Sequence, residues 1–222
     1  MLKSVDTHIV VTPKMAELYE KASKEVVVVN NAPYKDLFNN IEKTESNKLR
    51  IGFIGSVRYY DEMKALIDIC QKYKEDVEVI ICGRGIHSDK LAEYSKDLSN
   101  VKIKGAYNIK QLEELYRNID VTYAFYPGNT ATISMPNKFY ESVITETPII
   151  ANRDTEFGYE VHKNKLGYGI TEKNLTKELG EAIDKLVKDK NEKKNIVENM
   201  RNFKGNCFWE SNECKLKNIY DR

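Results

Sequence analysis

The feature that most constrains this chain is a regular alternation of short apolar runs and amphipathic stretches, beginning near residue 50. The apolar runs lie at residues 49–55, 77–83, 100–107, 120–127, 148–152 and 167–170. The stretches between them show helical spacing, as in Met63, Leu66, Ile67 and Cys70 after the first run. Strands that are apolar throughout and alternate with helices indicate a parallel sheet covered on both faces. The sequence therefore predicts an α/β fold with a doubly wound parallel sheet, which binds ligands at the carboxyl ends of its strands.

The two ends of the chain depart from this alternation. Residues 1–32 contain a strand, a helix and a second strand, and the polar stretch 30–48 that follows is typical of a linker. A strand–helix–strand fragment cannot bury both of its faces alone. We therefore expect residues 1–45 to be the end of another domain plus a linker. The main domain would then be residues 46–205, and residues 206–222 a separate amphipathic helix.

Charge and residue usage argue against several classes of partner. The chain has 222 residues, with 35 Lys plus Arg against 34 Asp plus Glu, so no net basic field favours nucleic acid. The longest apolar runs are strand-sized and the first residues carry no signal-peptide pattern, so a cytoplasmic protein is expected. Basic and apolar residues in the final helix would suit the inner membrane face, and an interdomain contact explains them equally well. Four cysteines and three histidines form no cluster, so no metal site is expected.

The segment SMPNKFYESV, residues 134–143, begins a helix that carries a lysine at its positive end. Lys138 lies in the opening turn, where free N–H groups and the dipole already create positive potential. Pro136 suits the first turn because it lacks an N–H group. A loop of small residues, a helix start and a cation form an anion site, so Lys138 is predicted to contact phosphate. Glu141, one turn later, would then accept hydrogen bonds from vicinal hydroxyls, as on ribose.

The alternative for Lys138 and Glu141 is a surface ion pair, which would contribute roughly a few tenths of a kcal/mol. The ligand interpretation is preferred because the pair also has the weaker orientation relative to the helix dipole.

Two further loops follow predicted strands. In the loop at 55–62, Gly55 and Ser56 allow close backbone approach and Arg58 offers a forked cation suited to phosphate. Taken alone, a turn with a surface arginine explains that loop better. In the loop at 82–90, Gly83 and Gly85 form part of a dinucleotide fingerprint, but its third glycine is replaced by serine and no acidic residue follows the next strand. A nicotinamide site therefore ranks last.

In this order, the segments resemble the C-terminal, nucleotide-sugar-binding half of GT-B glycosyltransferases of the retaining family four, also called group one. Residues 6–19 and 26–38 resemble the end of that family's N-terminal domain, and residues 208–220 resemble its final helix, which crosses back to that domain. The elements between them are matched, in order, by residues 51–68, 77–85, 101–121 and 135–151. The resemblance thus spans nearly the whole chain and implies sugar transfer from a nucleotide-diphosphate-sugar, with no metal or other cofactor.

The resemblance also implies roles for particular residues. Glu141 would bind the ribose hydroxyls of the donor, and the loop 128–135 with Asn137 and Lys138 would face the diphosphate or the sugar. Arg58 and Lys138 would neutralise the leaving pyrophosphate, which makes them the catalytic candidates. The remaining donor-binding candidates are Gly55 and Ser56 on the diphosphate side, and Gly83, Gly85, Gly105 and Tyr107 around the base. Four tyrosines, Tyr59, Tyr60, Tyr126 and Tyr140, would line a sugar or base pocket, although Tyr140 suits packing better.

Three departures from the family pattern matter. The first of the family's paired glutamates falls on Ile133, which leaves sugar recognition open. The family's phosphate-loop lysine falls on Asp61, so Arg58 would have to replace it. The acceptor-binding domain of the family precedes the point where this sequence begins.

These observations leave several hypotheses. The first is the donor half of a glycosyltransferase for a polysaccharide or glycoconjugate, acting on a glycan or lipid-linked acceptor. The second is a non-catalytic nucleotide-sugar-binding module, which only turnover would distinguish from the first. A 2-epimerase-like protein is the third, although the histidine and acid pairs for that chemistry are not evident. Apolar surface on residues 1–32 and on the final helix, including Phe208 and Trp209, should favour self-association or a partner chain.

Overall fold

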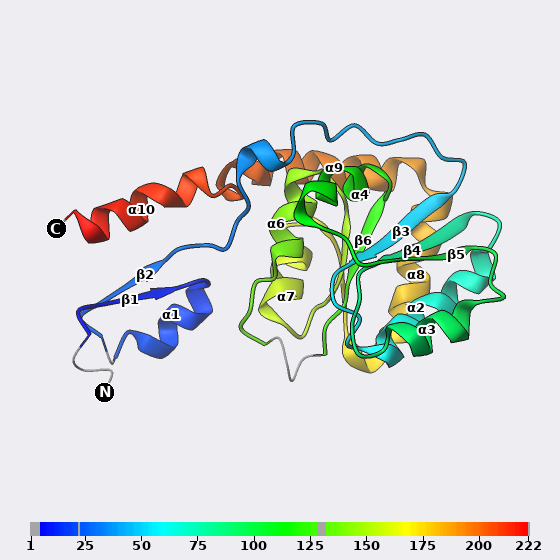
Figure 1. Cartoon of the computed structure of the whole chain (residues 1–222), viewed down its shortest axis with the longest axis horizontal. Coiled ribbons are helices and arrows are strands. Elements are labelled where there is room, and N and C mark those ends of the chain that lie inside the picture. The colour runs from blue at the N-terminus through cyan, green and yellow to red at the C-terminus, as the bar shows by residue number, and fades with distance from the viewer. Residues whose placement is uncertain (1–4, 22, 128–131, 222) are drawn as a thin grey trace.

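The computed structural model describes residues 5–21, 23–127 and 132–221 (Figure 1). Its main domain is built on one six-stranded parallel sheet, with the strand order β5-β4-β3-β6-β7-β8. The strands are β3 (Leu49–Ile54), β4 (Val77–Cys82), β5 (Val101–Gly105), β6 (Val121–Ala124), β7 (Ile149–Asn152) and β8 (Gly167–Ile170). This confirms the doubly wound parallel sheet predicted from the sequence, with every strand in its predicted segment.

Helices cover both faces of this sheet. They are α2 (Tyr60–Cys70), α3 (Ser88–Ser95), α4 (Leu112–Arg117), α6 (Asn137–Ile144), α7 (Glu156–Lys163), α8 (Leu175–Lys188) and α9 (Lys190–Phe203). Helix α2 packs against α3 and α8, and α6 packs against α9. Figure 1 shows α2, α3 and α8 grouped on one side of the sheet and α6 and α7 on the other. No described helix has both the length and the apolar composition needed to cross a membrane.

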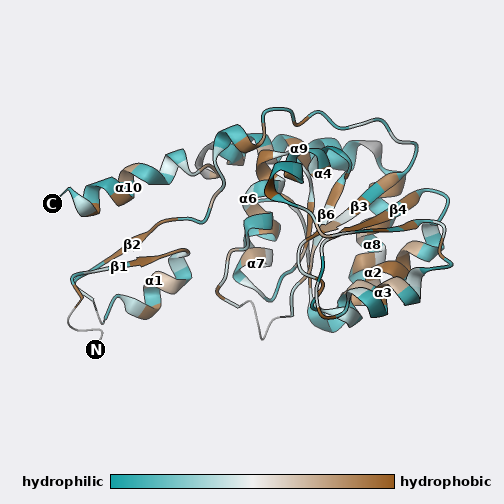
Figure 2. Cartoon of the chain, viewed as in Figure 1, coloured by the Kyte–Doolittle hydropathy of each residue, from teal (hydrophilic) through white to brown (hydrophobic). Residues whose placement is uncertain are grey.

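The core lies between the sheet and these two helix layers. Every residue of β6 and β7 is buried, and so is β3 from Arg50 onward. Figure 2 shows the hydrophobic colour concentrated on the strands and the inward sides of the helices. The edge strands β5 and β8 are only partly buried. Continuous burial on both faces explains why the central strands are apolar throughout rather than alternating.

A small lobe precedes the main domain. It consists of β1 (Thr7–Val10), α1 (Pro13–Tyr19) and β2 (Glu25–Val28), with β1 and β2 paired in parallel. Helix α10 (Glu210–Tyr220) extends from the main domain toward this lobe (Figure 1), and the Lys215 ammonium donates to the Val28 carbonyl at 3.2 Å. These contacts are compatible with the predicted division of the chain, which remains a prediction.

Several sequence-based expectations need correction. Helix α9 was not predicted, because only Ile196 and Met200 form its buried stripe among many charged residues. The stretch 30–48 is more than a polar linker: it contains a short 3₁₀ helix at Lys35–Leu37, and Phe38 is buried in the core. Helix α6 ends at Ile144, and Pro136 is its N-cap residue rather than part of its first turn.

The expected exposure of Phe208 and Trp209 is also wrong. Phe208 packs partly buried against the core, with the Lys35 ammonium 5.9 Å from its ring centre. Trp209 is half-buried, lies edge-on to Tyr34, and donates from its backbone N–H to the Pro33 carbonyl at 2.9 Å. The linker therefore covers the apolar residues that begin the last helix.

Candidate active site

The site is built where the order of strands reverses. The chain proceeds outward from β3 through β4 to β5 and then returns to β6 on the other side of β3. The loops that follow the neighbouring strands β3 and β6 therefore lead away in opposite directions. This is the place where open α/β sheets form a ligand crevice. A cavity of about 470 Å³ lies there, lined by Phe53, Gly55, Ser56, Arg58, Tyr59, Tyr126, Pro136, Asn137 and Lys138. The structure therefore brings together the loop predicted at 55–62 and the start of the helix predicted at 134–143.

Helix α6 presents an uncapped N-terminus beside this cavity. Its N-cap residue, Pro136, makes no side-chain capping hydrogen bond, and the first turn contains no acidic residue. The Phe139 N–H donates to the Pro136 carbonyl at 2.9 Å, and a helix start without a capping side chain suits an anion at the N–H groups before it. Lys138, in the same turn, lines the cavity with a side chain that is only 13% exposed. A helix start and a partly buried cation therefore add positive potential on one wall.

The Lys138 ammonium also contacts Glu141. Its Nζ lies 3.0 Å from Glu141 Oε2, and the same oxygen accepts a hydrogen bond from the Tyr116 hydroxyl at 2.9 Å. Glu141 is 4% exposed, so this is not the weakly contributing surface pair considered from the sequence. Glu141 is not among the residues that line the cavity, whereas Lys138 both lines it and contacts Glu141.

The opposite wall comes from the loop after β3. Gly55 donates its N–H to the Cys82 carbonyl at 2.9 Å, which holds this loop against the end of β4. Arg58 is exposed, and its Nε donates to the Ser56 hydroxyl at 3.2 Å. Asp61, which occupies the family's lysine position, lies in the first turn of α2 and is not among the lining residues. Arg58 is thus the cation that this loop directs to the cavity.

The loop after β4 packs tightly against the loop after β3. A Cβ atom on Gly83 would lie 1.8 Å from the Gly55 carbonyl oxygen, and one on Gly85 would lie 2.3 Å from the Val57 carbonyl oxygen. Close approach of two backbones therefore explains both glycines without a ligand. A second cavity of about 450 Å³ is lined by Gly83, Gly85 and Gly105 among others.

Tyr107 follows the end of β5 by two residues and lies near Lys138 and Glu141. Burial raises the pKa of Tyr107, the Lys138 ammonium opposes that rise, and the Glu141 carboxylate adds to it. The predicted base-side residue is therefore close to the predicted phosphate and ribose residues.

The four candidate tyrosines separate into two pairs. Tyr59 and Tyr126 line the 470 Å³ cavity and meet edge-on with ring centres 6.1 Å apart. Burial raises the pKa of Tyr126, so its hydroxyl stays protonated. Tyr60 instead faces Lys90, whose ammonium lies 3.7 Å from its ring centre, and Tyr140 is 4% exposed in the core.

The N-terminal lobe and the linker that follows it reach the site in a way that the sequence did not predict. Asn31 donates from its side-chain amide to Asn137 Oδ1 at 2.6 Å, at the first residue of α6. The Thr12 hydroxyl donates to the Ile133 carbonyl at 3.0 Å. Ile133 is thus an anchor for the lobe, and residues 128–131 of the predicted loop lie outside the described residues.

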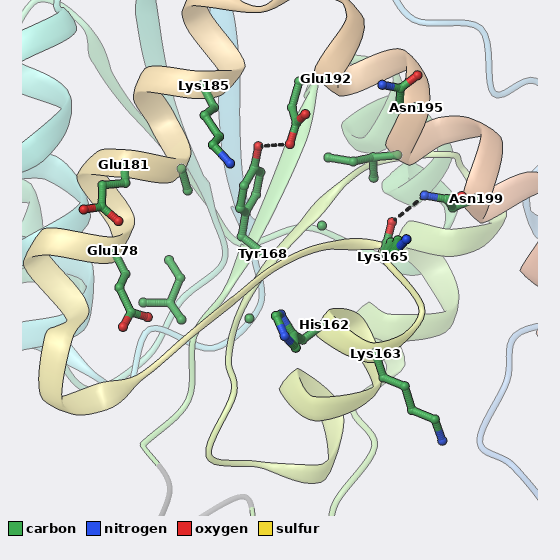
Figure 3. A pocket seen from close by; sticks show the side chains of 15 residues that line it. His162, Lys163, Lys165, Tyr168, Glu178, Glu181, Lys185, Glu192, Asn195 and Asn199 are labelled. Atoms are coloured by element: carbon green, nitrogen blue, oxygen red, sulfur yellow. Dashed lines mark hydrogen bonds between the residues drawn. The ribbon is translucent and has the colours of Figure 1, made fainter.

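A larger cavity of about 650 Å³ lies elsewhere, at the free edge of β8 between α7, α8 and α9 (Figure 3). Two of its polar side chains are already hydrogen-bonded: Tyr168 donates to Glu192 Oε1 at 2.5 Å, and Asn199 donates to the backbone carbonyl of Lys165 at 3.1 Å. This cavity runs along the edge strand β8 rather than at the switch between β3 and β6, and none of the predicted site residues lines it. Within the described part of the chain, no three His, Cys, Asp or Glu side chains gather to hold a metal ion.

Comparisons with known proteins bear on this geometry. The family model of the group 1 glycosyl transferases matches residues 48–189, whereas no curated protein matches the chain. HepE from Anabaena, solved with UDP and glucose, is 16% identical over 96% of this chain, with a TM-score of 0.74. Sucrose-phosphate synthase from Thermosynechococcus elongatus is 14% identical over 99% of this chain, with a TM-score of 0.79. The pneumococcal O-GlcNAc transferase GtfA, solved with UDP and GlcNAc, is 14% identical over 99%, with a TM-score of 0.74.

This chain is shorter than each of these proteins. It spans 62% of HepE, 59% of the synthase and 46% of GtfA. At such identities the likeness establishes the fold, and it confirms the fold class expected from the sequence.

Proposed function

This chain belongs to the group 1 glycosyl transferases, and from that premise we propose that it binds a nucleotide-diphosphate-sugar in the cavity between β3 and β6. The observation that carries the proposal is the uncapped start of α6, with Lys138 directed into the same cavity as Arg58. Two cations and a helix N-terminus around one crevice suit a diphosphate. The proposed reaction is transfer of the sugar to a glycan or lipid-linked acceptor in glycoconjugate synthesis.

The proposed chemistry depends on charge at the leaving group. When the glycosidic bond to the diphosphate breaks, negative charge grows on the departing oxygen. Arg58, Lys138 and the N–H groups of α6 would neutralise that charge without a metal, with retention at the sugar carbon. Removal of one pre-organised donor of this kind typically costs about 3–4 kcal/mol in the transition state. Arg58 and Lys138 are therefore the proposed catalytic residues.

We assign residues to the ribose, the base and the diphosphate of the donor by their proximity to Lys138. Glu141 would accept hydrogen bonds from the ribose hydroxyls once Lys138 turns to the diphosphate, because its carboxylate is one helical turn from the cation. The loop at 83–86 and residues Gly105 and Tyr107 would hold the base, since Tyr107 is close to both Lys138 and Glu141. Gly55, Ser56 and Asn137 would lie along the diphosphate.

The acceptor requires a further surface. Ile9 on β1 is 42% exposed, and Val11, which directly follows β1, is 36% exposed. His8, the neighbour of Ile9 in the strand and therefore on its opposite side, stacks on Tyr19 of α1. We propose that this open face packs against a further domain or partner chain that helps to hold the acceptor.

A nucleotide-sugar-binding module without turnover remains the second candidate function. Release of nucleoside diphosphate from a nucleotide-sugar in the presence of acceptor, absent from Lys138→Ala, would favour the enzyme.

The first test is thermal unfolding of wild type and Glu141→Ala with uridine, guanosine and adenosine diphosphates and with pyrophosphate. A ligand at a hundred times its Kd should stabilise wild type by about 2.7 kcal/mol. For a chain of this size that stabilisation raises the melting temperature by about 5–11 °C. The variant should lose the shift with the nucleoside diphosphate. Glu181→Ala is the matched control, because Glu181 is exposed and lines the separate cavity of Figure 3, so it should keep the shift. No shift of wild type with any nucleoside diphosphate would contradict the proposal.

A further inference from the structure

Tyr116 is a buried tyrosine that touches the proposed site without lining its cavity. It lies on α4, its side chain is fully buried, and its hydroxyl donates to Glu141 Oε2 at 2.9 Å. The Lys138 ammonium contacts the same oxygen at 3.0 Å. Two donors therefore converge on one carboxylate oxygen, and both hydrogen bonds reach an ionisable acceptor in a buried setting, where such bonds are strong.

The surroundings fix Tyr116 in place. The ring of Phe38 meets the Tyr116 ring edge-on, with centres 5.9 Å apart. The Lys43 ammonium donates to the Tyr116 carbonyl at 2.8 Å and to the Thr147 hydroxyl at 2.6 Å. Residues of the linker thus hold both the ring and the backbone of Tyr116, so the direction of its hydroxyl is set by packing on the side away from the cavity.

We infer that Tyr116 is a positioning residue for Glu141, an assignment that rests on the proposed function. Binding of a diphosphate gives the Lys138 ammonium a second anionic partner, so its three N–H donors are shared and its hydrogen bond to Glu141 weakens. The Tyr116 hydroxyl then remains as the donor on Oε2 and holds the carboxylate in its orientation. Oε1 is left to accept the ribose hydroxyls. Tyr116 therefore acts on nucleotide recognition through Glu141, and specifically on recognition of the ribose.

The test compares Tyr116→Phe with wild type in calorimetric titrations. The titrants are uridine, guanosine and adenosine diphosphates and their 2′,3′-dideoxy counterparts, which lack the hydroxyls that Glu141 would bind. Loss of a hydrogen bond to a charged group predicts roughly tenfold weaker binding of the preferred nucleoside diphosphate by Tyr116→Phe. Binding of the matching dideoxy compound should change less than twofold.

Tyr123→Phe is a matched control for loss of a buried hydroxyl. Tyr123 is 1% exposed on β6 and donates to the backbone carbonyl of Glu62 in the first turn of α2 at 3.0 Å, and it is not among the residues that line the cavity. It should lose thermal stability comparably while keeping wild-type affinity for both ligands. The double variant Tyr116→Phe with Glu141→Ala should bind no more weakly than Glu141→Ala alone, because both changes remove the same ribose contact.

The possible outcomes distinguish failure of the Tyr116 role from failure of the donor site itself. Equal weakening toward the ribose and dideoxy ligands, or no weakening at all, would overturn the role of Tyr116 and leave the donor site intact. Failure of wild type to bind any of these nucleoside diphosphates would overturn the proposed function together with the inference. Selective weakening toward the ribose ligand, absent from Tyr123→Phe, would establish it.

Discussion

Lys43 fixes the backbone of Tyr116 by a hydrogen bond, and burial of its ammonium destabilises the folded protein. Lys43 is a partly buried residue of the linker, and both hydrogen-bond acceptors of its ammonium, the Tyr116 carbonyl and the Thr147 hydroxyl, are neutral. Burial lowers the pKa of Lys43 to about 7; the Asp120 carboxylate opposes this, and the nearby Lys193 and Arg50 reinforce it. The folded protein therefore binds the Lys43 proton less tightly than the unfolded chain does.

This difference predicts a pH dependence with a definite sign. Between pH 7 and about 10.5 the unfolded state holds the Lys43 proton more often, so the free energy of unfolding should rise with pH. The slope from one proton is at most about 1.4 kcal/mol per pH unit. Lys43→Met should be more stable than wild type near pH 7, and its advantage should shrink as pH rises. Chemical denaturation at pH 7, 8, 9 and 10 measures this.

The comparison needs an exposed lysine as its reference. Lys185→Met removes such a lysine from α8, and its stability should follow wild type in parallel across the same pH range. Parallel profiles for Lys43→Met and wild type would show that the Lys43 proton is bound equally in the folded and unfolded states.

At the residue scale, the sequence predicted that Lys138 and Glu141 lie side by side, but it predicted neither their burial nor their contact with Tyr116. The spacing of Lys138 and Glu141 shows that they share a helix face, because residues three apart are neighbours on a helix. The Tyr116–Glu141 hydrogen bond joins positions 25 residues apart on different elements, and no local period encodes it. The burial of the Lys138–Glu141 pair was equally invisible, because it depends on what the sheet and α4 place around it.

At the scale of elements, the tight contact between the loops after β3 and β4 determines which residues those loops tolerate. Gly83 has φ of +135°, and a Cβ atom there would lie 1.8 Å from the Gly55 carbonyl oxygen. Gly83→Ala should therefore destabilise the protein by about 3 kcal/mol or more, since both the backbone and a carbonyl would have to move. Urea denaturation gives the change directly.

A second glycine-to-alanine change serves as the control. Gly180 lies within α8, and a Cβ atom there meets no heavy atom within 4 Å. Gly180→Ala should stabilise the protein by about 0.5–1 kcal/mol, because alanine is the better helix former. A Gly83→Ala protein as stable as Gly180→Ala would show that the loop after β3 can retreat without cost.

Elements were predicted best where their pattern was simplest. The six strands were found because each is a compact apolar run, and α2 was found because its apolar spacing is complete. Helix α9 was missed because its buried stripe is narrow, and the linker was misjudged because Phe38 is a lone anchor in a polar stretch. Both segments derive their order from tertiary contacts, which residue spacing does not reveal.

At the scale of the whole molecule, the lobe before the main domain leaves a two-stranded sheet with one covered face. Such a sheet is marginal alone. Replacing Ile9 and Val11 together by lysine should reduce self-association and binding of a hydrophobic dye, because their exposed side chains would no longer offer apolar area. Light scattering over a concentration series is the measurement.

Ile86→Lys is the reference for that experiment, since Ile86 is 83% exposed in the loop after β4, away from the lobe. It should leave association unchanged. A monodisperse monomer of the wild-type protein that binds no dye would argue that the open face is not an interface.

The two hydrogen bonds that join the lobe and the linker to the start of α6 have a mechanical consequence. Thr12 of the lobe holds Ile133 and Asn31 of the linker holds Asn137, so the chain is held on both sides of Pro136. A rotation of the lobe would act as a lever on the first turn of α6 and alter the width of the crevice. Whatever docks on the far side of β1 would thereby adjust the aperture through which a donor enters.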